Sequence, residues 1–295
     1  MKVFYSPAYA GSQVSFETTR KSGWIAESLA RSPIEGVELV PPAPLGDSDL
    51  LKIHDAGYAD AIRCGFPRWL AESQGFRWDA ALWPMVLASN GGAVAAAREA
   101  LERGIAGSLS SGLHHARREF GVGFCTFNGL ALAANAALDS GAGTVLILDL
   151  DAHWGGGTAS LIAGDPRIWQ LDVTVSGFDG YEPGERMRAV LVRQPGDYLE
   201  VIRRELDALR RSGRRFDLCL YNAGMDPFEG CSIGGLAGIT RPILEARERL
   251  VFEWCREGGT PIAFVLGGGY LGPLLDPDGL VGLHRFTIEA ARRVG

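Results

Sequence analysis

Three potential metal ligands follow an apolar run in the middle of the chain. In the segment LDLDAHWGGGT, residues 148–158, Asp149, Asp151 and His153 occupy alternate positions. Alternate side chains of an extended segment project from the same face, which predicts two carboxylates and one imidazole pointing the same way. Two such acids repel each other unless a cation lies between them. The pattern therefore predicts a divalent metal site, with catalytic zinc as the first choice and iron, manganese or cobalt as alternatives.

Two simpler interpretations of this segment exist. DLDAH could be a strand end with solvated acids, and GGGT could be an ordinary turn. A phosphate-binding loop is the other alternative, but no Gly-Lys-Ser or Gly-Lys-Thr follows the glycines. The nearby acids would also repel phosphate. The segment taken alone leaves a metal site and a solvated strand end as equal alternatives.

Four more side chains that could do chemistry come just after other apolar runs. They are His114 and His115 after GIAGSL, Asp226 after FDLCLYNAG, and Tyr270 after PIAFVLGGG. Each has an ordinary interpretation when taken singly: a core histidine beside a surface histidine, a turn aspartate, and a tyrosine packed on a sheet. The shared placement at strand ends is what favours one site.

Strands and helices must alternate to position these residues. Short runs rich in Ile, Val and Leu predict strands over 104–109, 144–151, 168–175, 216–224 and 261–269. Helical patterns cover 92–104, 129–141, 198–213 and 240–259. This alternation predicts a parallel sheet with helices on both faces, and such sheets bind ligands outside the carboxyl ends of their strands.

Composition narrows the class of protein. The chain has 295 residues, 46% of them hydrophobic, and α/β folds reach this length as one unit, so we expect a single domain over 1–295. The net charge of −6 provides no broad basic field, which disfavours nucleic acid as a partner. Five cysteines without a C-x-x-C pair predict reduced thiols.

The sequence also predicts no membrane partner. The N-terminal stretch MKVFYSPAYAG lacks an apolar core of signal-peptide length, and no window approaches about 18 uninterrupted apolar residues. We therefore expect a cytoplasmic protein. Nothing in the sequence decides the oligomeric state, so a homo-oligomer stays open.

In order along the chain, several blocks resemble the zinc-dependent deacetylases of the histone deacetylase family and their acetylpolyamine and acetoin-utilisation relatives. The blocks are HDAGYADAI, GLHHARREFGVGFCTFNGLALAA, LDLDAHWGGGT, NAGMD and LGGGYL. The resemblance implies a three-layer α/β/α fold of the arginase/deacetylase type with a central, mainly parallel sheet. It also implies hydrolysis of a linear amide bond. The substrate would be a small molecule or peptide carrying an acylated amine, such as acyl-lysine or an acylpolyamine, and the acyl group would most simply be acetyl.

Carried over residue by residue, the resemblance implies a role for each candidate. One zinc ion per chain would be held by Asp151, His153 and Asp226. Protons would be handled by His114 and His115, with Asp149 behind them, and Tyr270 would face the substrate carbonyl. A narrow tunnel would be lined by Phe124 and Gly123, and a structural potassium ion would lie beside Asp149 and Ser176.

Elementary chemistry is consistent with these roles. Two carboxylates and one imidazole neutralise most of the charge of a zinc ion and weaken its power to acidify water. A histidine acting as general base would then take a proton from the attacking water, while Tyr270 helps to stabilise the oxyanion. Asp149 is placed in sequence to orient one of the two histidines.

The chain departs from the family at several positions. The family usually has an Asp or Asn three residues after the metal-binding histidine to orient the second catalytic histidine, and here that residue is Gly156. Trp154 replaces the usual second histidine of that block. The N-terminal segment GSQVSFETTRKSG lacks the histidines that this loop often carries, and PFEGCSIGG has Cys231 near the usual Asp-Pro pair. These departures indicate a divergent, bacterial-type member.

Two other functions remain alternatives at this stage. A catalytically silent acyl-amine-binding protein is suggested by Gly156, because the proton relay would lack one carboxylate. An arginase-type binuclear hydrolase shares the sheet architecture but needs further Asp and His ligands for a second metal. With Gly156 in place, either His115 has a different partner or the proton transfer is redistributed, and the sequence leaves open which histidine is the base.

Overall fold

A single eight-stranded sheet forms the centre of the computed structural model, which describes residues 1–12 and 17–295. The strand order is β2-β1-β3-β8-β7-β4-β5-β6, and the neighbouring strands pair in parallel. The strands are β1 (Lys2–Phe4), β2 (Glu38–Val40), β3 (Ile105–Ser108), β4 (Val145–Asp149), β5 (Ile168–Thr174), β6 (Met187–Leu191), β7 (Leu218–Asn222) and β8 (Ile262–Val265). The predicted parallel sheet is confirmed.

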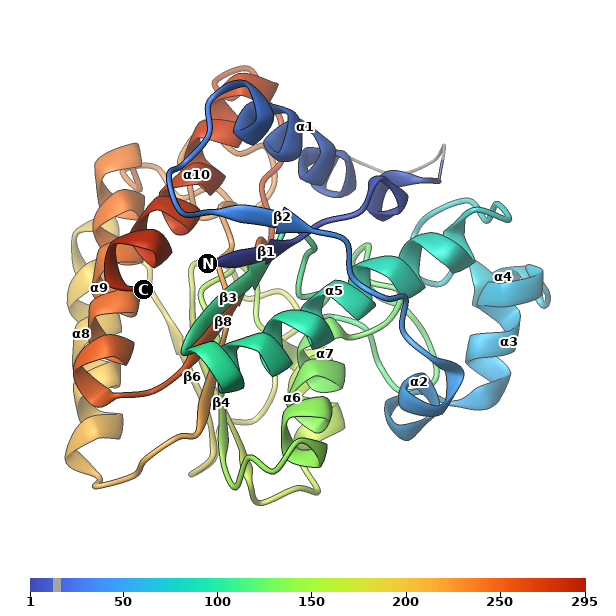
Figure 1. The fold of residues 1–295 in the computed structure, drawn as a ribbon, viewed down its shortest axis with the longest axis horizontal. Helices are drawn as coiled ribbons and strands as arrows, with labels where there is room; N and C mark the ends of the chain where they lie inside the picture. Colours follow the sequence, from blue (N-terminus) through green and yellow to red (C-terminus); the bar gives the residue numbers. More distant parts are fainter. Residues whose placement is uncertain (13–16) are drawn as a thin grey trace.

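Helices cover both faces of this sheet, which gives the three layers expected from the sequence (Figure 1). One face carries α5 (Leu82–Arg103), α6 (Gly129–Asp139) and α7 (Gly156–Ile162). The other carries α1 (Glu17–Arg31), α8 (Tyr198–Arg211), α9 (Arg241–Gly258) and α10 (Pro277–Val294). The short helices α2 (Asp47–Ile53), α3 (Ala56–Cys64) and α4 (Arg68–Ala71) form an outer group beside α5, and the 3-10 turns are η1 (Pro7–Ala10) and η2 (Pro195–Asp197).

The five predicted strands form because they are apolar on both faces. Every residue of β3, β4, β5, β7 and β8 is buried, as expected for parallel strands between two helical layers. The strands β1, β2 and β6 were not predicted, because two are three residues long and β6 is only half-buried. The amphipathic pattern of α8 buries residues at i, i+3 and i+4 spacing, the same pattern that predicted it.

One expectation about the strands is wrong. Strand β4 ends at Asp149, so Asp151 and His153 lie in the loop that follows it and not on one face of a continued strand. The backbone bends after Asp149, where the Asp149 carboxylate accepts a hydrogen bond from the Asp151 amide at 3.1 Å. Position in this loop, and not strand alternation, therefore directs the two later side chains.

The strand order brings the candidate residues to one edge. The strands β3, β8, β7 and β4 are consecutive neighbours, and the loops at their carboxyl ends carry the histidine pair, Tyr270, Asp226 and the Asp151–His153 segment respectively. Loops from elements far apart in sequence thus meet above the middle of the sheet.

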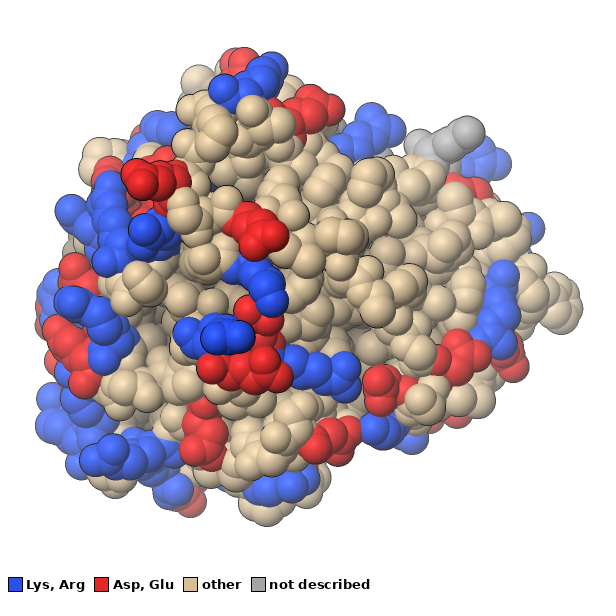
Figure 2. Space-filling view, viewed as in Figure 1, with Lys and Arg blue, Asp and Glu red and all other residues tan. Residues whose placement is uncertain are grey.

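The surface view shows charges of both signs mixed together. In Figure 2, Lys and Arg side chains alternate with Asp and Glu along the left and lower margins of the face drawn, beside a broad area of other residues. Among the helices that the structure describes, none is long and apolar enough to cross a membrane.

The side chain of His54 joins the histidine-pair loop to the start of α6. His54 is 1% exposed, its Nδ1 donates to the Arg117 carbonyl at 2.9 Å, and its Nε2 accepts from the Asn128 amide at 2.9 Å. Asn128 in turn donates to the His114 carbonyl at 3.2 Å. Burial lowers the pKa of His54 to about 4, so the ring is neutral and makes both hydrogen bonds.

This geometry predicts a defined pH dependence of stability. An unfolded histidine titrates near 6.5, so between about pH 6.5 and 4 the unfolded chain binds one more proton at His54 than the folded chain does. The stabilising contribution of neutral His54 is present above this window and is lost as the pH falls through it. We expect His54→Gln to unfold at lower urea concentration at pH 7.5 but to lose less stability than the wild type between pH 6.5 and 4. Parallel pH profiles for the two proteins would contradict this.

Candidate active site

Three buried ligand atoms come together at the carboxyl ends of β4 and β7. They belong to Asp151, His153 and Asp226, and they all lie within 4.8 Å of one another. The His153 Nδ1 is 3.1 Å from Asp151 Oδ1 and 3.1 Å from Asp226 Oδ2. The structure therefore assembles the three predicted metal ligands from two neighbouring strand ends.

The chemistry of this cluster fits a divalent metal. Asp226 is fully buried, and its Oδ2 makes no hydrogen bond of good geometry with the described residues, although His153 Nδ1 lies 3.1 Å away. Burial and the adjacent Asp151 raise the pKa of Asp226 to about 6. Burial alone would lower the pKa of His153, but the two carboxylates raise it to about 11. The site thus attracts positive charge, and three oxygen and nitrogen donors with room for a further ligand are typical of catalytic metal sites.

The two metal-ligand loops are fixed by contacts with each other and from behind. Asp226 Oδ1 accepts from the Ala152 amide at 3.0 Å, which ties the loop after β7 to the loop after β4. Behind them Arg247 of α9, which is fully buried, donates to the Leu150 carbonyl at 3.1 Å and contacts the Met225 sulfur at 3.5 Å. One guanidinium therefore holds the residue before Asp151 and the residue before Asp226.

Glycine is required where the loop after β8 crosses this centre. Gly268 has a φ of 51°, and a Cβ at this position would collide with the carboxylate of Asp226. Its carbonyl accepts a hydrogen bond from Lys21 of α1, a buried lysine that was not predicted from the sequence. Burial lowers the pKa of Lys21 to about 8, against the opposing influence of the Asp226 and Asp151 charges.

The two adjacent histidines each pair with a buried carboxylate. His114 Nδ1 lies 2.7 Å from Asp149 Oδ2, which is the contact expected for one of the pair. Asn222 holds the other oxygen of Asp149 at 2.9 Å. His115 Nδ1 lies 2.8 Å from Asp179 Oδ2, so the second histidine also has a partner despite Gly156.

These contacts fix how many protons the pair can hold. A carboxylate accepts only, so the Nδ1 atom of each ring carries a hydrogen. The two Nε2 atoms face each other at 3.1 Å, which requires one of them to be a donor and the other an acceptor. The pair therefore holds one imidazolium and one neutral imidazole.

The surroundings favour His114 as the charged member. Burial alone would lower its pKa, but Asp149 and Asp151 raise it to about 10. Burial and the neighbouring His114 charge lower the pKa of His115 to about 4, although Asp179 acts in the opposite direction. An acid and a base are thus placed side by side.

Asp179 and its neighbour Phe178 are the main site residues that sequence reasoning missed. Both lie in the loop after β5, whose strand was predicted over 168–175. The Phe178 ring packs edge-on against His115 and His153, with centroid distances of 5.1 and 5.8 Å. The available signal was the segment SGFDGYEPG, because it follows a predicted strand at the same edge of the sheet.

The remaining predicted catalytic residues line one narrow pocket with an empty volume of about 450 Å³. Its lining includes His114, His115, Asp151 and Tyr270, together with the predicted tunnel residues Gly123 and Phe124. Leu113, Phe124 and Asp179 border this region with positive φ angles of 54°, 65° and 60°. Side chains rarely adopt this conformation, and each instance costs about 1–3 kcal/mol, so the surrounding packing must hold them in place.

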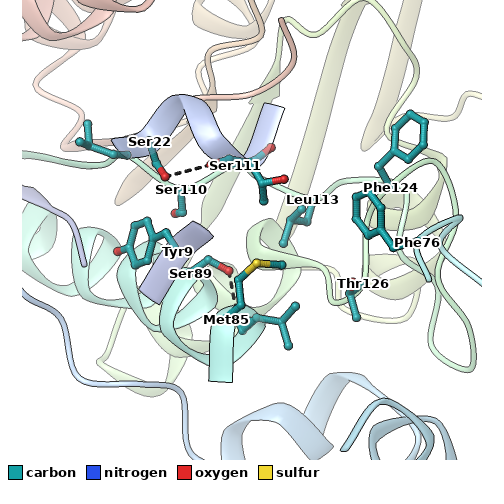
Figure 3. A pocket seen from close by; sticks show the side chains of 13 residues that line it. Tyr9, Ser22, Phe76, Met85, Ser89, Ser110, Ser111, Leu113, Phe124 and Thr126 are labelled. Atoms are coloured by element: carbon teal, nitrogen blue, oxygen red, sulfur yellow. Dashed lines mark hydrogen bonds between the residues drawn. The ribbon is translucent and has the colours of Figure 1, made fainter. Parts of the chain in front are cut away.

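A second cavity adjoins this pocket on the side of α5. It shares Thr19, Ser111, Leu113 and Phe124 with the pocket and has an empty volume of about 420 Å³. Figure 3 shows Phe76 and Phe124 on one side of it, where their rings stack at 5.6 Å, with Tyr9, Ser89 and Met85 farther along. The two hollows therefore share one wall, which the four shared residues form.

Ser176, the residue predicted to border a potassium ion, makes hydrogen bonds to the loop after β4 and to a neighbour in its own loop. Its amide donates to the Ala152 carbonyl at 2.8 Å, and its Oγ accepts from the Phe178 amide at 3.4 Å. A potassium ion beside Asp149 and Ser176 stays a prediction. Of the N-terminal segment GSQVSFETTRKSG, residues 13–16 lie outside the described part of the structure.

Comparisons with known proteins agree with the sequence blocks. A family model described as the histone deacetylase domain matches residues 15–275. An uncharacterized protein of Picosynechococcus sp. is 34% identical over 247 residues, which cover 82% of this chain and 81% of that protein. Histone deacetylase 2 of Arabidopsis thaliana is 28% identical, over 92% of this chain and 75% of that one. The crystal structure of an acetylpolyamine aminohydrolase from Burkholderia pseudomallei has the same fold, with a TM-score of 0.80, 18% identity, and coverage of 100% of this chain and 99% of that one.

Metal binding provides a direct test of the three-ligand cluster. We expect metal-free protein to bind one equivalent of zinc in a calorimetric titration, and Asp226→Asn to weaken binding by more than the roughly 10- to 100-fold typical of lost outer-shell partners. Asp217 flanks the opposite end of β7 and accepts from the Gly143 amide at 2.8 Å, so Asp217→Asn is the matched control. Equal zinc affinity of the two variants would contradict the assignment.

A second test concerns the close approach at the start of α7. A Cβ on Gly156 would collide with the backbone carbonyl of Asp179, whereas a Cβ on Gly164 would meet no atom of the described structure within 4 Å. Alanine favours helices over glycine, so a loss of stability in Gly156→Ala must come from the collision. We expect Gly156→Ala to lower the free energy of unfolding by about 1–3 kcal/mol in urea denaturation. Gly164→Ala should stay near the wild type, and equal stabilities would show that the loop gives way freely.

Proposed function

Because the chain belongs to the histone deacetylase family, we propose that it is a zinc-dependent amidohydrolase that removes a small acyl group, most simply acetyl, from an acylated amine. One observation carries the proposal: a single narrow pocket is lined by Asp151 of the three-donor metal cluster, by the two carboxylate-paired histidines and by Tyr270. Amide hydrolysis needs an electrophilic centre, a base, an acid and an oxyanion donor. Each of these needs has a candidate among these residues.

Asp151, His153 and Asp226 would hold the zinc ion. When bound there, zinc would supply Lewis acidity toward a carbonyl oxygen and lower the pKa of a water molecule. Zinc is proposed over other divalent metals because its catalytic sites favour three nitrogen and oxygen ligands from the protein.

The histidine pair would move the protons of the reaction. Neutral His115 has its Nδ1 hydrogen held by Asp179, so its Nε2 would take a proton from the attacking water in exchange for the contact with His114 Nε2. The water oxygen forms a bond to the carbonyl carbon, the carbon–nitrogen bond breaks, and the leaving nitrogen takes a proton from the pair. The products are a carboxylate and a free amine.

Tyr270 would donate to the oxyanion that forms on the carbonyl carbon. Burial and the charges of Asp226 and Asp151 raise its pKa well above the ordinary value, so the phenol keeps its hydrogen at neutral pH. A donor already in place when charge develops stabilises the transition state more than the substrate.

The shape of the pocket supports a linear substrate. Phe124 lines the pocket, with its ring centroid 6.3 Å from that of Tyr270, and Phe178 packs against His115, which also lines it. Apolar walls above a polar base suit an extended methylene chain that ends in an acylated nitrogen, as in acyl-lysine or an acylated polyamine.

The two alternative functions now have less support. The silent binding protein was suggested by the missing carboxylate at Gly156, and Asp179 supplies a carboxylate to His115 from another loop. The binuclear hydrolase needs a second metal cluster, and the described residues contain only the group around His153.

The function is tested by hydrolysis of a substrate panel. We expect protein with one equivalent of zinc to release carboxylate from at least one class among acetylpolyamines, acyl-lysine peptides and small acetamides. Tyr270→Phe should lower kcat by about 100- to 1000-fold, the range found when one oxyanion donor is removed. Tyr5→Phe is the matched control, because Tyr5 follows β1 and is not part of the pocket lining. No turnover of any panel member by zinc-loaded wild type would refute the proposal.

A further inference from the structure

We propose that Asp179 is the positioning residue for His115, and that the loop after β5 supplies a carboxylate which the position of Gly156 does not. This inference rests on the proposed function for its catalytic consequence. Its structural basis is independent of that function, because it follows from contacts among residues of this chain.

Three donors meet the carboxylate of Asp179, two from the loop after β3 and one from the first turn of α7. Oδ2 accepts from His115 Nδ1 at 2.8 Å and from the Gly157 amide at 3.2 Å, and Oδ1 accepts from Arg117. The side chain is 5% exposed although the backbone around it lies at the surface. A carboxylate with both oxygens engaged inside the protein is held in one orientation.

The space for this carboxylate exists because residue 156 has no side chain. A Cβ there would overlap the Asp179 backbone carbonyl and come within 2.8 Å of its Oδ1. Asp179 itself has a φ of 60°, which turns its side chain inward from an exposed loop. Aspartate tolerates this conformation better than most residues. The missing side chain at residue 156 and the positive φ of Asp179 together allow the Asp179 carboxylate to lie beside His115.

Arg117 connects the Asp179 carboxylate to the backbone at the start of α7. Its guanidinium donates to the Asp179 carboxylate through one nitrogen and to the Gly156 carbonyl through another. It lies two residues after His115 in the same loop, so the histidine and the arginine approach Asp179 together. The positive charge balances the carboxylate, which would otherwise be buried with a neutral histidine.

The consequence for chemistry is a fixed tautomer and ring orientation. Because a carboxylate only accepts, His115 keeps its hydrogen on Nδ1 and its Nε2 is left as the acceptor, which faces His114 Nε2 at 3.1 Å. Without Asp179 the ring could place its hydrogen on Nε2 or rotate away. A base that is wrongly oriented or in the wrong tautomer lowers the rate of the chemical step more than it lowers substrate binding.

The kinetic experiment compares Asp179→Asn with Asp165→Asn in zinc-loaded full-length protein. Both aspartates flank β5 and pair with arginine, but Asp165 lies at the opposite edge of the sheet, where it contacts Arg167 at 2.6 Å. We expect Asp179→Asn to lower kcat by roughly 10- to 100-fold, the range for a lost outer-shell partner, with KM changed less than about twofold. Asp165→Asn should match the wild type, and zinc content is measured in each protein.

The second readout does not depend on activity. In metal-free protein labelled with ¹⁵N-histidine, NMR reports which ring nitrogen carries the hydrogen, and His115→Gln assigns the His115 signals. We expect the Nδ1–H form in the wild type and in Asp165→Asn. Asp179→Asn should shift His115 toward the Nε2–H form, because the side-chain amide that replaces the carboxylate can donate a hydrogen bond to Nδ1. Asp179→Ala is recorded as well, and it should leave the tautomer mixed.

The outcomes separate this inference from the proposed function. An active wild type with Asp179→Asn kcat within about twofold of it would overturn the positioning role and leave the deacetylase function standing. An unchanged His115 tautomer in both Asp179 variants would overturn the positioning role even if kcat falls. The fall in kcat would then come from a disturbed conformation of the loop after β5. If the wild type turns over no substrate, the proposed function fails, and the NMR result alone decides whether Asp179 orients His115.

Discussion

The structure depends on holding carboxylates inside the protein at one edge of the sheet. Asp149, Asp151 and Asp226 are each less than 5% exposed, and a buried carboxylate without compensation is strongly unfavourable. Asp149 is compensated by His114 and Asn222, whereas Asp151 and Asp226 share the single imidazole of His153. The charge that this imidazole does not satisfy is the physical reason to place a cation there.

The scaffold makes this concentration of charge possible by being rigid around it. The four central strands are buried on both faces, and Arg247 holds two of their loops from behind. Strained positions such as Leu113 and Phe124 occur next to the site, where the backbone must turn sharply to aim neighbouring side chains. The same rigidity lets a glycine pass within contact distance of the Asp226 carboxylate.

The pairing of His115 with Asp179 illustrates that a catalytic arrangement is defined by where charge lies in space. An imidazole needs an acceptor near Nδ1, and the identity of the loop that brings it has no chemical significance. In this chain the loop after β4 contributes only a glycine at that point, and the space it leaves is filled by the loop after β5. Phe178 comes with the same loop, so the change also brings an aromatic ring against His115.

By itself, the sequence determined the fold class, the five inner strands and the kinds of side chain available at the carboxyl edge. These depend on local properties: continuous apolar runs are buried, and residues that directly follow them lie at the strand ends. It did not determine the directions of side chains beyond β4, where the expected strand alternation was wrong, nor the partner of His115. That partner lies 64 residues away in a loop without apolar periodicity. Only the tertiary structure decided this contact, because it depends on how two loops cross, on a backbone angle at Asp179 and on the absence of a side chain at Gly156.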